Sequence, residues 1–327
     1  PDEFDILLGH YNHAHKSKVT AGRTVVFDEF PDAYERSLAV MKRAISYWLS
    51  TVDGVPFEDY TDLVEHRDDQ ERRGEALLWF EEHGVEPAER QVFDDPHAHA
   101  DAPLAVYTLL AGEDLGNGFE RAEIGDGAVG IYNRETTEVS VLQPPALQYT
   151  SGIVALDGTP TKRMWELSLG ERLNHRPVLQ DGERGEYIEH ALNLNFVRSS
   201  EYIKSYNSAE HVAVDADAAL LEAIVDEHGK RPALITTMTA KAEYDDAGVL
   251  ELVDETKHYG NVLGSNEFDD TRLGAVIGSN HYGDQYIKKW GGYAGATVER
   301  EAGAKGADLS YGGGFGDDVL RHMREHD

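Results

Sequence analysis

The stretch Val25-Val26-Phe27-Asp28-Glu29 carries the strongest indication of the fold. Its three consecutive apolar residues are β-branched or aromatic, and such a continuous run is typical of a strand buried inside a parallel sheet. Asp28 and Glu29 follow at the carboxyl end of this predicted strand, which is the edge where parallel α/β sheets bind their ligands. Burying two charges there costs free energy unless a cation or hydrogen-bond donors meet them. The stretch therefore predicts an α/β fold with a ligand site at its two carboxylates.

The two carboxylates suit a magnesium ion that is shared with substrate phosphates. Mg²⁺ usually takes one or two protein carboxylates and keeps several of its waters. We assign Asp28 to the hydration shell of such an ion, so that it holds the metal through water. Glu29 would orient or deprotonate the water that attacks a phosphate. The alternative interpretation is that Asp28 only caps a following helix.

Apolar patterns along the rest of the chain predict further strands and helices. Strand-like runs and helical periodicities alternate in the second half, and such alternation indicates a parallel sheet covered by helices. Between residues 34 and 143, helical patterns instead precede two short strand patterns. Predicted strands cover residues 4–10, 23–27, 129–132, 138–142, 151–157, 187–197, 232–237 and 273–279. Predicted helices cover residues 34–49, 71–83, 103–110, 164–167, 217–228, 239–247, 284–294 and 321–327.

The charge of the chain is strongly negative. Its 61 acidic and 30 basic residues give a formal net charge of −31, yet 40% of its 327 residues are hydrophobic and 16 are tyrosines. A disordered acidic chain lacks such aromatic content, so the acids are expected to coat a folded surface. Molar salt shortens the range of charge repulsion to about 3 Å. The simplest setting is therefore the interior of a salt-loving (halophilic) cell, and a generic acidic protein is the alternative.

The residue types that are missing narrow the setting further. Cysteine is absent, which excludes a disulfide framework and a thiolate metal site. No apolar run approaches 18 residues and no charged-then-apolar leader opens the chain, so we expect a cytoplasmic protein without a membrane partner. The chain begins with Pro1 rather than Met and ends in a charged helical pattern. Both ends are therefore expected to be cuts through a larger protein.

Four short motifs in a fixed order resemble those of XPD-like superfamily 2 helicases of the DEAD/DEAH type. The run Tyr11-Asn12-His13-Ala14-His15 precedes the acidic pair as the DNA-touching loop of that family precedes its DEAH-type box. Leu156-Asp157-Gly158-Thr159-Pro160-Thr161 resembles motif III, whose small hydroxyl residues link the nucleotide state to the DNA path. The predicted strand at 232–237 resembles motif IV. Gly264-Ser265-Asn266-Glu267-Phe268, ahead of the strand at 273–279, resembles motif V.

The resemblance implies an α/β protein with two RecA-like parallel-sheet lobes, of which the first is incomplete. Residues 1–34 and 151–175 would form the end of lobe 1, residues 176–327 lobe 2, and residues 35–150 a mainly helical accessory insertion. It also implies an ATP-dependent helicase or translocase that acts on nucleic acid, with DNA favoured, and that uses ATP and Mg²⁺. The residues that match the family motifs are the catalytic pair Asp28 and Glu29, the coupling residues Asp157, Thr159 and Thr161, and Gly264, Ser265 and Asn266 of motif V.

Two departures from the family pattern limit what this chain is expected to do alone. It contains no G-x-x-x-x-G-K-[ST] phosphate-binding loop and no arginine-bearing motif VI. We expect both in sequence outside this chain, and we expect the 327 residues by themselves to hydrolyse no ATP. Two rival hypotheses stay open. One is a RecA-like ATPase that remodels its target without unwinding, and the other is a non-catalytic nucleic-acid-binding protein.

An acidic protein needs contacts with nucleic acid that survive high salt. Counterion release contributes little under those conditions, whereas base stacking on aromatic rings is worth about 1–3 kcal/mol per base. Hydroxyl groups and backbone amides also keep their value. Core packing is the alternative role for each tyrosine. The predicted nucleic-acid contacts are Tyr11, Asn12, His13, Thr236, Thr237, His281 and Tyr282.

Two groups of histidines raise the question of a transition-metal site, because histidine and carboxylate side chains bind such metals together. The favoured interpretation of both groups is nevertheless that the histidines are solvated or face DNA. The first group is His10, His13 and His15, and the second is His97 and His99 near Asp94, Asp95 and Asp101.

Overall fold

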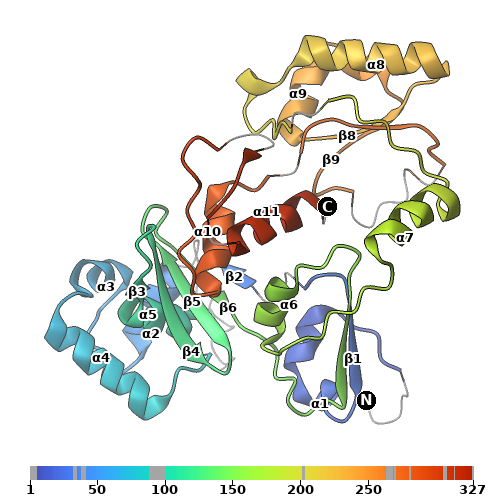
Figure 1. Cartoon of the computed structure of the whole chain (residues 1–327). Helices are drawn as coiled ribbons and strands as arrows, with labels where there is room; N and C mark the ends of the chain where they lie inside the picture. Colours follow the sequence, from blue (N-terminus) through green and yellow to red (C-terminus); the bar gives the residue numbers. More distant parts are fainter. Residues whose placement is uncertain are drawn as a thin grey trace. The chain divides into compact units, whose positions relative to one another are not determined.

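The computed structural model describes residues 6–31, 35–37, 42–87, 101–200, 203–262, 268, 270–279, 281–304, 308–312 and 314–325. Its elements, which Figure 1 colours along the chain, divide into two compact units. Unit 1 comprises residues 1–175, 285–299 and 311–319, and unit 2 comprises residues 176–284, 300–310 and 320–327. Two small parallel sheets and one antiparallel sheet make the structure a mixed α/β one, as the sequence predicted.

The antiparallel sheet of unit 1 has five strands in the order β2-β6-β5-β4-β3. Helices α2 to α5 lie together on one side of this sheet (Figure 1). Its strands are β2 (Glu35–Ser37), β3 (Glu113–Asp114), β4 (Phe119–Gly125), β5 (Ala128–Asn133) and β6 (Glu138–Leu142). The helices are α2 (Lys42–Thr51), α3 (Tyr60–His66), α4 (Gln70–His83) and α5 (Ala102–Ala111). Helices α4 and α5 confirm the predicted helices at 71–83 and 103–110, whereas the helix predicted at 34–49 is confirmed only in part: residues 35–37 form β2, and α2 begins at Lys42. Elements β3, β4 and α3 were not predicted either, so the region is less helical than expected.

Both faces of this sheet are covered. Alternate residues of a strand point to opposite faces, so neighbouring residues of β5 contact different helices. Tyr132 of β5 packs with α5 and α2 in the main core of unit 1. Ile131, its neighbour, instead approaches Gly292 of α10 (Asp284–Tyr293). Gly130 allows α5 to come close, since a Cβ at this position would lie only 1.9 Å from the Thr108 hydroxyl oxygen. Glycine is therefore required at this contact.

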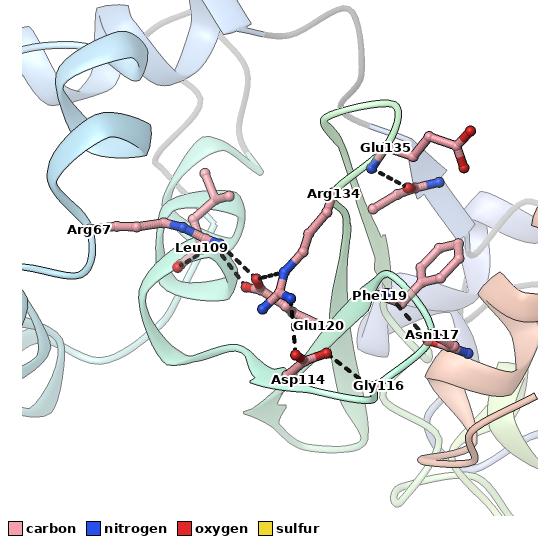
Figure 2. A network of polar contacts seen from close by, with 10 residues as sticks. Arg67, Leu109, Asp114, Gly116, Asn117, Phe119, Glu120, Arg134 and Glu135 are labelled. Carbon is pink, nitrogen blue, oxygen red and sulfur yellow. Dashed lines mark hydrogen bonds and ion pairs between the residues drawn. The ribbon is translucent and has the colours of Figure 1, made fainter.

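A buried glutamate organises the polar contacts between α3, α5 and the sheet (Figure 2). Glu120 of β4 is 3% exposed and accepts two hydrogen bonds from the Arg67 guanidinium, at 2.7 and 2.6 Å. Arg134 donates to the same carboxylate through Nε, at 2.5 Å, and also pairs with Asp114. Burial by itself would raise the pKa of Glu120, but hydrogen bonds and charge from the two arginines outweigh it and lower that pKa below its ordinary value. Glu120 is thus held as a carboxylate.

The strand that carries the acidic pair is β1 (Thr24–Asp28), and it pairs in parallel with β7 (Gly152–Leu156). Both strands were predicted, and both are confirmed. Phe27 is buried, and the nearby Phe30 ring lies 5.5 Å from Trp165 of α6 (Lys162–Leu169). Aromatic packing therefore fixes the carboxyl end of β1 against the helix that follows β7.

One face of this parallel pair carries apolar side chains that are exposed. Val26, Val154 and Leu156 are 56%, 42% and 50% exposed. The residues paired in register, Val26 with Val154 and Asp28 with Leu156, alternate with the more buried Phe27. The sequence predicted strands buried on both faces, as is usual in parallel sheets. Within unit 1, Val26, Val154 and Leu156 instead leave one face of the pair exposed.

The parallel sheet of unit 2 has the strand order β10-β8-β9. Its strands are β8 (Ala233–Thr236), β9 (Thr256–His258) and β10 (Gly274–Val276), and its main helices are α8 (Val214–His228) and α9 (Met238–Asp246). The chain passes from β8 to β9 on one side and then returns to place β10 on the other side of β8. The predicted alternation of helix and strand is confirmed between residues 214 and 276. A core around Leu221, Leu234 and Tyr244 joins the sheet to its helices.

Two segments predicted as strands have another conformation. Residues 6–10 have no regular structure, and residues 4 and 5 lie outside the described part. In the segment 187–197, Tyr187–Ala191 forms a π-helix after α7 (Asp181–Glu186), and no strand follows. Phe196 and Val197 are 79% and 93% exposed there. An apolar run becomes a strand only where a neighbouring strand offers hydrogen bonds to its backbone, and this segment has no such neighbour in the described part of the chain.

A buried aspartate ties together the core of unit 2. The Asp217 side chain of α8 accepts hydrogen bonds from the hydroxyls of Tyr206, at 2.6 Å, and Tyr244, at 2.8 Å. All three residues are buried. Burial, and next the contact with Asp217, raises the pKa of both tyrosines above the ordinary value of 10.0. Both hydroxyls therefore stay protonated and serve as donors.

Replacing Asp217 with leucine is expected to destabilise unit 2 by about 2 kcal/mol or more, because two buried hydroxyls lose their acceptor. Asp217→Asn is the matched control, since an amide oxygen can still accept. Amide hydrogen exchange over α8 and β8 would measure the difference. Equal protection in the leucine and asparagine variants would contradict this role.

In the wild type, the raised tyrosine pKa values predict that the stability of unit 2 holds below pH 10 and falls as the pH rises above it.

Candidate functional site

The carboxyl ends of β1 and β7 meet at one edge of their parallel sheet. Asp28 pairs in register with Leu156, and the backbone N–H of Glu29 donates to the Leu156 carbonyl at 2.9 Å. Asp157 is the next residue along the chain. The two segments that the sequence assigned to the acidic box and to motif III are therefore neighbours in space, although about 130 residues separate them in the chain.

Both carboxylates of the acidic pair are exposed. The prediction that they are buried, and need a cation to offset lost hydration, is wrong, because exposed carboxylates keep their hydration. Residues 29–31 are not helical, so the alternative role of Asp28 as a helix cap has no support. An exposed pair at a strand end can still take a hydrated Mg²⁺ ion, because that ion keeps most of its waters.

Glu29 has an unusual backbone conformation. Its φ of +68° lies in the left-handed region, which residues other than glycine rarely adopt. Holding such a residue costs of order 1–3 kcal/mol, so the surroundings must impose the conformation. Strained residues of this kind are concentrated at active sites and ligand clamps. Asp126, Thr137, Asn193 and Tyr206 also have a positive φ, so the strain at Glu29 supports a site only together with the two carboxylates at the end of β1.

Tyr11 is one of the groups that impose this conformation. It begins the short 3₁₀ helix η1 (Tyr11–His15), and its hydroxyl donates to the carbonyl of Asp28 and, at 3.3 Å, to that of Glu29. Its ring stacks on Phe27, with centroids 6.4 Å apart and planes 16° from parallel. The ring is half-buried. The sequence predicted Tyr11 as a base-stacking residue, but its ring already stacks within the protein.

Asn12 and His13 follow Tyr11 in η1, and both side chains are exposed. The backbone N–H of Asn12 donates to Nδ1 of His10 at 3.3 Å, which caps the start of η1. The acidic pair and two exposed polar side chains thus belong to one small region of unit 1. That region can offer hydrogen bonds to a ligand from Asn12 and His13.

The predicted motif III residues have local structural contacts. Asp157 accepts a hydrogen bond from the Thr159 backbone, at 2.8 Å, and another from the Trp165 indole, at 2.6 Å. This carboxylate orders the loop before α6 and anchors a buried tryptophan. Thr159 is half-buried, whereas Thr161 is 2% exposed and stands at the amino end of α6. Asp157 therefore positions the loop. Asp157 and Thr159 remain partly accessible, whereas Thr161 does not.

The predicted contacts in unit 2 gather at the carboxyl ends of β8 and β10. Thr237 caps α9 by accepting from the Ala240 backbone at 3.1 Å, and it donates to the Tyr206 carbonyl at 3.2 Å. Thr236 is fully buried. Its side chain faces the core and cannot reach a ligand. Strand order reverses between β8 and β10, and ligands of open α/β sheets bind at such a reversal.

His281 and Tyr282 follow β10. The His281 ring accepts a hydrogen bond at Nδ1 from the Gly283 backbone, at 3.0 Å, so its neutral form carries the proton on Nε2. Burial, as the largest cause, lowers the pKa of His281 and keeps the ring neutral at pH 7. Tyr282 is 52% exposed and can offer its ring to a base. Gly264, Ser265 and Asn266 lie outside the described residues.

Metal ligands do not cluster in the part of the chain that the structure describes, where no three histidine, aspartate or glutamate side chains come together in a metal-binding arrangement. His10, His13 and His15 belong to that part. His97 and His99, with Asp94 and Asp95, lie outside it. Asp101 is buried at the amino end of α5.

The sequence matches no known protein family, no curated protein and no solved structure. Among the described residues, no helix is both long enough and apolar enough to cross a membrane. The geometry of the two sheets and the residues at their carboxyl ends are therefore the basis for a functional assignment.

Proposed function

We propose that the intact protein is an ATP-driven helicase or translocase acting on nucleic acid, with DNA favoured, and that its two parallel sheets belong to RecA-like lobes. One observation carries the proposal. The carboxyl end of β1 brings Asp28 and Glu29 beside the loop that begins at Asp157, on the adjacent parallel strand β7. In parallel α/β sheets this edge is where phosphate-bearing ligands bind.

The chemistry follows from the two carboxylates. A bound Mg²⁺ would neutralise the charge that develops on the phosphate oxygens. Asp28 would orient the waters of that ion, and Glu29 would accept a proton from the water that attacks the phosphate. Carboxylate oxygens are the ligands that Mg²⁺ prefers, and both side chains are exposed, so they fit this ion. The 327 residues contain no phosphate-binding loop motif, so ATP binding requires residues outside them.

The sheet of unit 2 supports the second lobe of the proposal. Its strand order reverses at β8, and Thr237 and Tyr282 lie on the segments that leave β8 and β10 at their carboxyl ends. Hydroxyl and aromatic groups suit contact with a single strand in concentrated salt, where ion pairs with phosphates lose their value. Such contacts need no excess of basic residues, and the chain has none, since its net charge is −31.

A second candidate is a nucleic-acid-binding protein without catalysis. The missing phosphate-binding loop motif favours it. A third candidate is a RecA-like ATPase that remodels its target without unwinding. It would use Asp28 and Glu29 in the same way, and would differ only in the work that ATP hydrolysis drives.

The test is ATP hydrolysis and strand displacement by the intact protein, in KCl above about 1 M so that charge repulsion is screened. We expect Mg²⁺-dependent turnover that rises when single-stranded DNA is added, together with displacement of a labelled strand from a duplex. Turnover without displacement would refute unwinding and leave a translocase or the remodelling ATPase. Binding of DNA without turnover would support the non-catalytic protein. Absence of turnover, displacement and binding would overturn all three.

A further inference from the structure

Glu29 is held in its left-handed conformation from two sides. On one side its N–H donates to Leu156 of β7, at 2.9 Å. On the other side its carbonyl accepts from the Tyr11 hydroxyl, at 3.3 Å, and the same hydroxyl also donates to the carbonyl of Asp28. The peptide groups around the acidic pair are therefore fixed between a strand and the helix η1.

The contact to Tyr11 links residues that lie 17 and 18 positions apart in the chain. Phe27 holds the Tyr11 ring by stacking, and this contact keeps the hydroxyl aimed at the end of β1. Asn12 and His13, the next two residues of η1, are exposed. A ligand that binds Asn12 and His13 therefore acts on the same short helix that supplies the hydroxyl.

We propose that Tyr11 is a positioning residue for the acidic pair: its hydroxyl holds the backbone of Asp28 and Glu29 and transmits nucleic-acid contact on η1 to the Glu29 carboxylate. The expected effect on ATP hydrolysis rests on the proposed function, whereas the hold of the Tyr11 hydroxyl on the backbone of residues 28 and 29 does not. Tyr11 then has a different role from the base stacking that the sequence suggested. A strained backbone is a suitable element for such transmission, because it relaxes when one of its supports moves.

The deciding variant is Tyr11→Phe in the intact protein, because it removes the hydroxyl and keeps the ring on Phe27. We expect kcat for nucleic-acid-stimulated ATP hydrolysis to fall about tenfold or more, since small misplacement of a catalytic group has effects of this size. KM for ATP and the affinity for single-stranded DNA are expected to stay within about twofold of the wild type, because Tyr11 binds neither ligand. Tyr149→Phe is the matched control, since Tyr149 is 64% exposed in the same unit.

A second readout needs no enzyme activity. Amide hydrogen exchange at the Glu29 N–H reports whether the bond to Leu156 persists. We expect faster exchange in Tyr11→Phe than in the wild type and in Tyr149→Phe, with unchanged exchange in the core of unit 1. Exchange at wild-type rate would overturn the inference whether or not the protein hydrolyses ATP.

The two readouts separate the failure of this inference from the failure of the proposed function. A wild-type protein without turnover refutes the proposed function, and the exchange experiment then still tests the role of Tyr11. A wild-type kcat in Tyr11→Phe refutes the positioning role. Weaker DNA binding with an unchanged kcat at saturating DNA would assign Tyr11 to base contact instead, and would also refute it.

Discussion

ATP turnover by the intact protein is expected to fall at least about 100-fold when Glu29 is replaced by glutamine or Asp28 by asparagine. General-base catalysis contributes about 10²–10⁴ in rate, and an amide cannot accept the proton. Loss of the Asp28 charge weakens the hold on a hydrated Mg²⁺ ion instead. The two variants should therefore differ: Asp28→Asn should need more Mg²⁺ for half-maximal turnover, and Glu29→Gln should not.

The stability of both variants provides the control. Both side chains are exposed, and substitutions at such positions usually change the free energy of unfolding by less than about 0.5 kcal/mol. Glu81→Gln, at an exposed position of α4 in the same unit, should retain full turnover. Wild-type turnover in Asp28→Asn or in Glu29→Gln would show that the acidic pair is not the hydrolytic site.

The largest effect on stability is expected from Arg67→Met, at about 3–5 kcal/mol. Arg67 forms a two-bond pair with the buried Glu120, and its side chain is itself only 14% exposed. Removing it leaves a buried carboxylate with one remaining arginine. The cost therefore comes mainly from a buried carboxylate that has lost one of its two arginine partners, rather than from the net value of the ion pair.

All four tryptophans of the chain lie in unit 1, so tryptophan fluorescence during urea unfolding reports this unit. Arg134→Met should cost less, because the Arg134 side chain is 47% exposed. The double variant Arg67→Met with Glu120→Leu should recover most of the loss, since apolar replacements of buried ion pairs are often neutral. If the double variant is as unstable as Arg67→Met alone, the loss comes from packing and not from the charge of Glu120.

The same pair predicts how the stability of unit 1 depends on pH. The pKa of Glu120 is lower in the folded chain than its ordinary value of 4.5. Its contribution is therefore complete above pH 4.5 and is lost as the pH falls toward the folded value. A Glu120→Gln variant should lack this part of the acid sensitivity.

Several elements could be predicted from the sequence because their signals are local. The continuous apolar runs at 23–27 and 151–157 predicted β1 and β7, and helical spacing predicted α4, α5 and α8. The apolar run at 187–197 gave a wrong prediction, since its hydrophobicity does not say whether a partner strand exists. Short elements such as β3 and α3 carry too few residues for a period to be recognised.

The candidate site could be predicted only in part. Two carboxylates directly after a predicted strand, together with the order of the helicase-like motifs, made Asp28 and Glu29 the predicted catalytic pair. The structure adds that Thr236 faces the core and that Asp157 is engaged by Trp165. Neither fact can be predicted from the sequence, because a single threonine or aspartate occurs in cores, turns and ligand sites alike.

The sequence by itself determined the α/β pattern, the acidic surface and the position of the acidic pair, because periodicity, composition and order along the chain are local properties. Only the tertiary structure decided that β1 lies beside β7, that Glu120 lies between Arg67 and Arg134, and that the Tyr11 hydroxyl holds residues 28 and 29. Each of these contacts joins segments far apart in the chain. Their geometry depends on how side chains pack across the fold, and no spacing within a single segment encodes it.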